Sequence, residues 1–196
     1  MTDTATIPEN QQPFVRDVDE QLRISASWDV VHRPTTASAL SARIRAATLA
    51  LKALERDLSS KKTTAGSDES MNSAVRELRA NKRMLRSALR TVAEMPRLVD
   101  HLPRIVQPAQ SDQPRIAAIA ASYFRLVDWD FSEPALRVFV QGLQKHEPLT
   151  IAELWNLSAF LEFILLESVL DKARILLHYP GSDAVLHIGE IGRAHV

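Results

Sequence analysis

The chain has 196 residues, 45% of them hydrophobic, and its 24 basic and 24 acidic side chains leave no formal net charge. That balance gives no electrostatic reason to expect nucleic acid or anionic lipid as a partner. The absence of cysteine excludes a disulfide framework and thiolate chemistry, and it leaves the redox compartment open. Five glycines against ten prolines, without alternating runs of Val, Ile and Thr, favour helices joined by stiff linkers.

Two segments bear on export and membrane insertion. Residues 1–12 are polar and lack the basic start and the apolar run of a secretory signal. The most apolar stretch, Leu154 to Leu170, contains Glu162 and Glu167, and carboxylates in the middle of a membrane span are costly. We therefore expect this piece of the protein to be soluble and to have no direct membrane span.

Residues 1–35 predict a flexible N-terminal tail, because their side chains are mostly polar and three prolines interrupt them. One small apolar cluster around Ile24 and Trp28 is suited to dock on the body of the protein.

A long helical hairpin is predicted over 36–95, where two apolar stripes at helical spacing flank a polar loop. Lys82 interrupts the second stripe at a position where the pattern asks for an apolar residue. The first stripe consists of Leu40, Ile44, Ala47, Leu51, Leu54 and Leu58, and the second of Met71, Val75, Leu78, Leu85, Leu89 and Val92.

The C-terminal part predicts a connector followed by three helices. Prolines within 96–113 predict a connector there, since proline removes a backbone donor and fixes φ. Three helices follow over 114–179, and the last begins with a capping box of Thr150 and Glu153. This last helix is apolar on most sides, which is typical of a helix packed by several neighbours. The predicted fold class is all-α, a bundle of about five helices with a long central C-terminal helix.

Candidate metal ligands and catalytic acids are few. The six histidines do not share a helical turn, and cysteine ligands are absent. Paired carboxylates on the last helix, such as Glu167 and Asp171, can do acid–base work on a sugar, but such neighbours more often form a solvated face or pair with Lys172 and Arg174. Glu162, inside the apolar run, is predicted either to be the one wet edge of the helix or to pair with a buried arginine. The histidines are His32, His101, His146, His178, His187 and His195.

Aromatic and basic clusters have two interpretations each. The rings of Tyr123, Phe124, Trp129 and Trp155 form either a sugar-stacking platform or, as is more usual at helical spacing, part of the core. Trp129 is the better candidate for exposure because it lies in a predicted turn. A basic cluster on the second hairpin helix either meets phosphate or forms a solvated face, which the zero net charge favours. The cluster consists of Arg79, Lys82, Arg83, Arg86 and Arg90. We assign no catalytic residue, metal ligand, cofactor or ligand-binding residue.

The second half of the chain resembles a stretch of the cyclic β-1,2-glucan synthases. The resemblance is carried by the run Arg-Ile-Ala-Ala-Ile-Ala from Arg115, by Phe139, by Glu-Pro-Leu-Thr-Ile-Ala-Glu-Leu-Trp over 147–155, and by Leu-Leu-Glu over 165–167. It covers most of residues 70–178. The chain has Ala152 where the family shows glycine, and Asn-Leu-Ser over 156–158 where the family shows Ala-Leu-Pro. The family's Gly-Tyr-Tyr turn is missing.

The resemblance implies a parent that is a large enzyme on the cytoplasmic side of the bacterial inner membrane. In that family a glycosyltransferase builds β-1,2-glucan from UDP-glucose with a divalent metal, and a phosphorylase-like glycoside hydrolase domain trims the product. No catalytic residue of the family maps onto residues 1–189. Residues 190–196 resemble the translation of a common sequencing adapter, so we expect adapter read-through there, and we expect 180–189 to be the truncated start of the next segment.

Two functions follow as hypotheses. In the first, the chain is a non-catalytic structural or regulatory region that packs on the missing downstream domains of a glucan synthase-like enzyme. In the second, it is a stand-alone helical interaction module, for instance a homodimer through the stripe from Leu40 to Leu58. A contiguous exposed apolar patch favours the first hypothesis, because a self-sufficient module has no reason to leave one uncovered.

Overall fold

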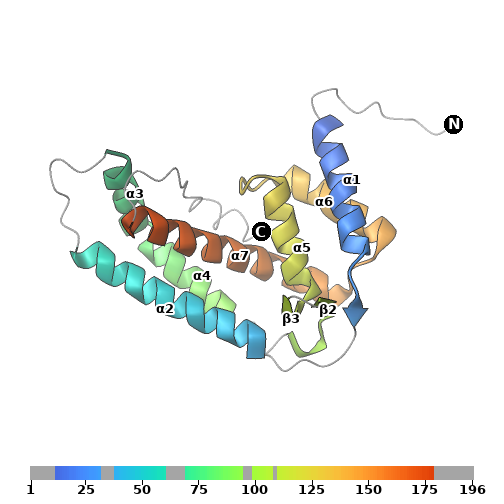
Figure 1. Ribbon diagram of the computed structural model, residues 1–196, viewed down its shortest axis with the longest axis horizontal. Helices are drawn as coiled ribbons and strands as arrows, with labels where there is room; N and C mark the ends of the chain where they lie inside the picture. Colours follow the sequence, from blue (N-terminus) through green and yellow to red (C-terminus); the bar gives the residue numbers. More distant parts are fainter. Residues whose placement is uncertain (1–11, 32–37, 61–68, 95–98, 108–109, 179–196) are drawn as a thin grey trace.

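The computed structural model describes residues 12–31, 38–60, 69–94, 99–107 and 110–178. Helices dominate this part of the chain and the sheet is small, which confirms the all-α prediction (Figure 1). The helices are α1 (Gln12–Ala26), α2 (Ser38–Ser60), α3 (Glu69–Ala80), α4 (Lys82–Glu94), a short 3-10 helix η3 (Val99–His101), α5 (Arg115–Leu126), α6 (Glu133–His146) and α7 (Ile151–His178). The strands are β1 (Val30–Val31), β2 (Arg104–Gln107) and β3 (Gln110–Pro114).

Helix α7 is the centre of the fold, as its apolar composition predicts. It packs against α2, α3, α4 and α5, and Figure 1 shows it running through the middle of the molecule. Every residue from Phe160 to Leu166 is between 0 and 6% exposed, so this stretch is covered on all sides. Burying one large apolar side chain contributes about 1.5–3 kcal/mol, which makes this stretch a principal source of stability.

Helices α2 and α4 form the predicted hairpin, and the stripe from Leu40 to Leu58 faces inward with each member 4–7% exposed. The second arm of the hairpin is broken at Asn81, where α3 ends and α4 begins. The side-chain amide and the backbone amide of Asn81 both donate to the carbonyl of Glu77, each at 3.0 Å, so that one carbonyl is shared where α3 ends. This break is one reason why the described part has seven α-helices rather than the predicted five.

The other reason is α1, which lies within the region predicted to be a flexible tail. The prediction was wrong for residues 12–31. Val18, Leu22 and Ser25 recur at helical spacing and are buried where α1 packs against α5 and α6. Gly142 of α6 lets the helices approach closely, since a Cβ there would lie 2.6 Å from Cδ1 of Leu22. Residues 1–11 and 32–35 of the predicted tail lie outside the described residues.

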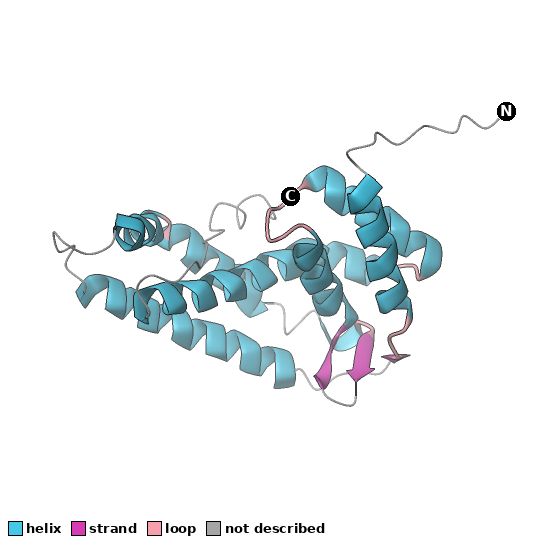
Figure 2. Cartoon of the chain, turned by 45° about the horizontal axis from the view of Figure 1, so that its top comes forward, coloured by secondary structure: helices cyan, strands magenta, loops and turns pink. Residues whose placement is uncertain are grey.

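The predicted connector contains strands, which the sequence pattern did not indicate. Strand β2 pairs antiparallel with β1 and with β3, and Figure 2 shows the small sheet at one edge of the helical body. Val30 lies opposite Ile105, and Arg104 lies opposite Pro114. The backbone amide of Arg115 then donates to the carbonyl of Pro103 at 2.7 Å. The sheet therefore ties α1 and the start of α5 together.

Candidate interaction surface at the start of α7

The first turn of α7 is fixed by the predicted capping box. The backbone amide of Glu153 donates to Oγ1 of Thr150 at 3.2 Å, and the amide of Thr150 donates to Oε2 of Glu153 at 2.9 Å. The hydroxyl of Thr150 also donates to the same carboxylate oxygen at 3.0 Å. Two backbone donors at the helix start are thus satisfied, which defines where α7 begins and the direction in which it leaves the preceding turn.

Arg115, the first residue of α5, holds this turn from the inside. Its guanidinium donates from Nε and Nη2 to the two carboxylate oxygens of Glu153, at 2.8 and 2.6 Å. Nη1 donates to Glu147 at 2.7 Å, and Nη2 also donates to the carbonyl of Pro148 at 3.2 Å. The side chain of Arg115 is 4% exposed and that of Glu153 is fully buried. One arginine therefore locks three points of the segment from 147 to 153.

We call Arg115 with its partners Glu147, Pro148 and Glu153 the clamp. The charge state of Arg115 follows from these surroundings. Burial lowers the pKa of Arg115, but the hydrogen bonds and the negative charges of Glu153 and Glu147 outweigh burial, so that the net shift of the pKa is upward. Arg115 stays charged, and two carboxylates share it. Such a buried, bidentate pair has high geometric specificity. The pair is therefore suited to hold the first turn of α7 rigidly in place.

The outward face of the same turn is apolar. Ile151 is 68% exposed, Leu154 is 39% exposed and Trp155 is 83% exposed, and their spacing places them side by side on one face of α7. Only six large hydrophobic side chains of the described residues are at least 39% exposed, and three of them lie between positions 151 and 155. We call Ile151, Leu154 and Trp155 the α7 patch.

The four predicted aromatic candidates do not come together as a platform. Tyr123 and Phe124 are fully buried, and the hydroxyl of Tyr123 donates to the carbonyl of Ser132 at 2.7 Å. Trp129, predicted to be the exposed ring, is partly buried and stacks on Phe124 with ring centroids 5.7 Å apart and planes 6° apart. The prediction was wrong about which tryptophan is exposed, because Trp155 projects outward.

Trp129 folds back because of its backbone. Asp128 and Trp129 both have positive φ, 48° and 65°, and the amide of Trp129 donates to the carbonyl of Phe124 at 2.8 Å. This left-handed turn at the end of α5 returns the indole to the core. The ammonium of Lys172 lies 5.3 Å from the indole centroid, at the distance of a cation–π contact. Burial lowers the pKa of Lys172, and the charge of Asp128 opposes that shift.

The carboxylates of α7 lie in separate environments. Glu162 is 5% exposed, so it is not a wet edge, and its pairing with a buried arginine stays a prediction. Glu167 binds Arg43 of α2 through two hydrogen bonds, at 3.1 and 2.5 Å, and the guanidinium also lies over the ring of Phe163. The partner of Glu167 is therefore on another helix, and neither Lys172 nor Arg174 has that role. Asp171 is exposed beside a cavity of about 340 Å³ between α2 and α7.

The basic cluster belongs to the outer side of the hairpin. Arg86 makes two hydrogen bonds to Glu55, at 2.6 and 3.0 Å, and Arg79 donates to the carbonyl of Leu58 at 2.6 Å. Hydrogen bonding from Arg86 lowers the pKa of Glu55, burial opposes this, and the charges of Arg86 and Lys82 add to it. Arg83 and Arg90 are exposed.

Three of the six histidines lie within the described residues. His178 lies 3.6 Å from Asp57, while His101 and His146 are exposed; His32, His187 and His195 lie outside the described residues. Within the described ranges, no group of three potential metal ligands converges on one point. None of the described helices is both long and apolar enough to cross a membrane.

Comparisons with known proteins add no relative to this picture. No protein-family model, curated protein or solved structure matches the chain. Functional inference therefore depends on the geometry of the site and on the resemblance of its sequence motif.

Sequence reasoning missed Arg115 as the residue that organises the site. The signal that could have identified Arg115 is its place at the start of a helix of small apolar residues. A charged side chain in such a setting is rarely buried without a partner. Identifying that partner required the fold, because Glu153 is 38 positions away along the chain.

Proposed function

We propose that this chain is a non-catalytic helical region of a cyclic β-1,2-glucan synthase-like enzyme. In this proposal the α7 patch of Ile151, Leu154 and Trp155 docks on the downstream domains of the parent chain. The parent would transfer glucosyl units from UDP-glucose on the cytoplasmic side of the bacterial inner membrane. The role of the present chain is structural or regulatory.

The observation that carries the proposal is the exposure of Trp155, at 83%, two residues after Glu153, whose buried carboxylate is paired with Arg115. Tryptophan is enriched among the residues that contribute most of the binding energy in protein–protein interfaces. Its ring buries a large area on binding, while few side-chain torsions have to become ordered. The clamp of Arg115 and Glu153 fixes the patch before binding, which lowers the entropy cost of association. The patch also lies within the Pro-Leu-Thr-Ile-Ala-Glu-Leu-Trp motif, the part of the sequence most similar to the family.

A stand-alone module that dimerises through the stripe from Leu40 to Leu58 receives less support. A homodimer through the stripe from Leu40 to Leu58 would need that stripe to be exposed, whereas each member is 4–7% exposed and packs inside the molecule. Any self-association would have to use another surface, such as the α7 patch itself.

The test begins with the gene and continues with a binding measurement. Long-read sequencing across and beyond codon 189 of the source DNA shows whether the frame continues into transferase and hydrolase domains. The polypeptide encoded downstream is then expressed separately and titrated with this chain by calorimetry. We expect binding that Trp155→Ala weakens about 30-fold, the effect of a binding hot spot.

Leu49→Ala serves as the matched control, because Leu49 is also an exposed apolar side chain, at 66%, but lies on α2. It should leave the affinity unchanged. A frame that ends after codon 196, or downstream domains that ignore Trp155, would reject the proposal. Dimerisation of the chain that Trp155→Ala abolishes would instead establish the stand-alone module.

A further inference from the structure

The outward face of α2 carries three cations around one leucine. Arg45, Leu49, Lys52 and Arg56 follow one another at spacings of four, three and four residues, so they share one side of the helix. All four are exposed, and Leu49 is 66% exposed. They lie opposite the buried stripe of α2, so that the same helix has a core side and a second, basic side with an apolar centre.

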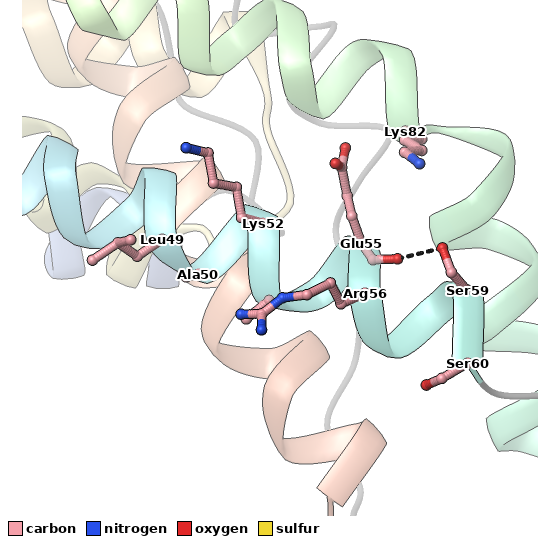
Figure 3. Close-up of a pocket in the computed structure, with 9 residues that line it drawn as sticks. Leu49, Ala50, Lys52, Glu55, Arg56, Ser59, Ser60 and Lys82 are labelled. Atoms are coloured by element: carbon pink, nitrogen blue, oxygen red, sulfur yellow. Dashed lines mark hydrogen bonds between the residues drawn. The ribbon is translucent and has the colours of Figure 1, made fainter.

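A shallow open groove of about 1100 Å³ follows this face (Figure 3). Lys52 and Arg56 of α2 line it together with Lys82 of α4, and Leu49 forms part of its apolar lining. Glu55 is the one acidic side chain among the lining residues, and Arg86 holds its carboxylate through two hydrogen bonds. The groove therefore presents three cations beside a carboxylate that is already neutralised.

Although the whole chain has no net charge, basic side chains are concentrated in the hairpin. The described residues of the hairpin, 38–60 and 69–94, contain ten basic and five acidic side chains, a net charge of +5. Since the whole chain is neutral, the remainder carries the compensating negative charge. The neutral composition of the whole chain therefore does not exclude an anionic partner for this face.

We propose that the outward face of α2, formed by Arg45, Leu49, Lys52 and Arg56 together with Lys82, binds the surface of an anionic lipid bilayer. A helix that lies flat on a bilayer presents cations to the lipid phosphates and an apolar side chain to the acyl boundary, which is the arrangement here. Each cation near such a surface strengthens binding about fivefold.

The chemistry of the face favours lipid over nucleic acid. An exposed leucine at the centre of the cations has no partner on a phosphate backbone, whereas the edge of the acyl region accepts it. Single-stranded nucleic acids are bound by aromatic rings that stack on bases, and none of the residues that form this face or line its groove is aromatic. The face is independent of the α7 patch, so this inference does not depend on the proposed docking.

The experiment measures binding of the whole chain to vesicles by co-sedimentation. Vesicles of equal parts phosphatidylglycerol and phosphatidylcholine should bind the chain at low salt, and pure phosphatidylcholine should not. The triple variant Arg45→Gln, Lys52→Gln, Arg56→Gln should bind about a hundredfold more weakly, because three cations are lost. High salt should weaken the binding of the unmodified chain in the same direction.

A second triple variant controls for net charge. Arg23→Gln, Arg137→Gln and Lys145→Gln remove three exposed cations from α1 and α6, on the other side of the molecule from α2 (Figure 1), and should leave vesicle binding nearly unchanged. Leu49→Ser should weaken binding several-fold without any change of charge. Failure to bind anionic vesicles, equal losses in both triple variants, or tight binding to a single-stranded RNA without binding to vesicles would overturn the proposal.

Discussion

The carboxylate of Glu153 accepts two hydrogen bonds from the guanidinium of Arg115, and neither side chain is accessible to solvent beyond a few per cent. The same carboxylate caps the first turn of α7 through Thr150. Glu153 therefore joins a local signal, the capping box, to a contact between helices. This double role connects the direction of α7 to the position of α5.

Glu153→Gln should destabilise the protein by about 3–5 kcal/mol, because it leaves the charge of Arg115 buried with one carboxylate instead of two. Urea denaturation of the variant measures the loss. Thr150→Ala, which removes only the capping hydroxyl, should cost about 1 kcal/mol. The double variant Arg115→Met, Glu153→Leu should lose less than the sum of the single variants, since no fully buried charge is left without a partner; Glu147, which loses Arg115, is 34% exposed and can be solvated. A loss below about 1 kcal/mol for Glu153→Gln would contradict this account of the clamp.

Gly142→Ala tests how α1 docks. A Cβ at position 142 would lie 2.6 Å from Cδ1 of Leu22, so the buried leucine would have to move. Overpacking of this kind typically costs about 1–3 kcal/mol, and the better helix propensity of alanine offsets up to about 1 kcal/mol of it. We expect net destabilisation in thermal unfolding. In the background of Leu22→Ala the same substitution should be neutral or stabilising, and an equal effect in both backgrounds would show that the contact is unimportant.

Local signals in the sequence predict much of this fold. The stripe of α2, the apolar run of α7 and the capping box at Thr150 each depend on residues within one or two helical turns, so periodicity and cap chemistry suffice to identify them. The three-stranded sheet depends on pairing between Val30 and Ile105, which are far apart in the chain and leave no periodic pattern in strands this short.

The candidate site was harder to predict, because exposure depends on what the rest of the chain covers. Trp155 has the spacing of a core residue, yet no described element packs over it, whereas a left-handed turn brings Trp129 back onto Phe124. The partner of Arg115 depends on the relative placement of α5 and α7. Net charge likewise averages over the molecule and gives no information about one face of α2.

The contrast between Trp155 and Phe163 tests the assignment of surface and core. Trp155→Ala should change the free energy of unfolding by no more than about 0.5 kcal/mol, as is usual for an exposed side chain. Phe163→Ala should cost about 3–5 kcal/mol, because the ring is fully buried and lies beneath Arg43. Chemical denaturation of both variants gives the comparison. A large loss for Trp155→Ala would mean that the indole packs on the body of the protein and is unsuited to docking.

The ion pair of Glu55 and Arg86 should give a small stability term that depends on pH. Hydrogen bonding from Arg86 places the pKa of Glu55 in the folded state below its ordinary value of 4.5. The pair therefore stabilises the fold above that value and loses its effect as the pH falls through the folded pKa. The difference in unfolding free energy between the unmodified chain and Glu55→Gln should be greatest near neutral pH and should vanish in strong acid. A difference that grows on acidification would contradict the sign of the shift.

The left-handed turn at Trp129 predicts that the glycine variant of this position is more stable than the alanine variant, the reverse of the order in a helix. Trp129→Ala and Trp129→Gly both remove the stack on Phe124 and the contact with Lys172, so both should destabilise the protein. With φ at 65°, alanine keeps the strain of a left-handed residue, about 1–2 kcal/mol, whereas glycine relieves it.

The glycine variant of position 129 should therefore unfold at a higher urea concentration than the alanine variant, despite the greater backbone entropy of glycine in the unfolded chain. Ala50→Gly, at an exposed position within α2, is the matched control and should cost about 1 kcal/mol, the normal order for a helix. If alanine is the more stable residue at position 129 as well, the turn has an ordinary right-handed backbone in solution, and some other contact brings the indole onto Phe124.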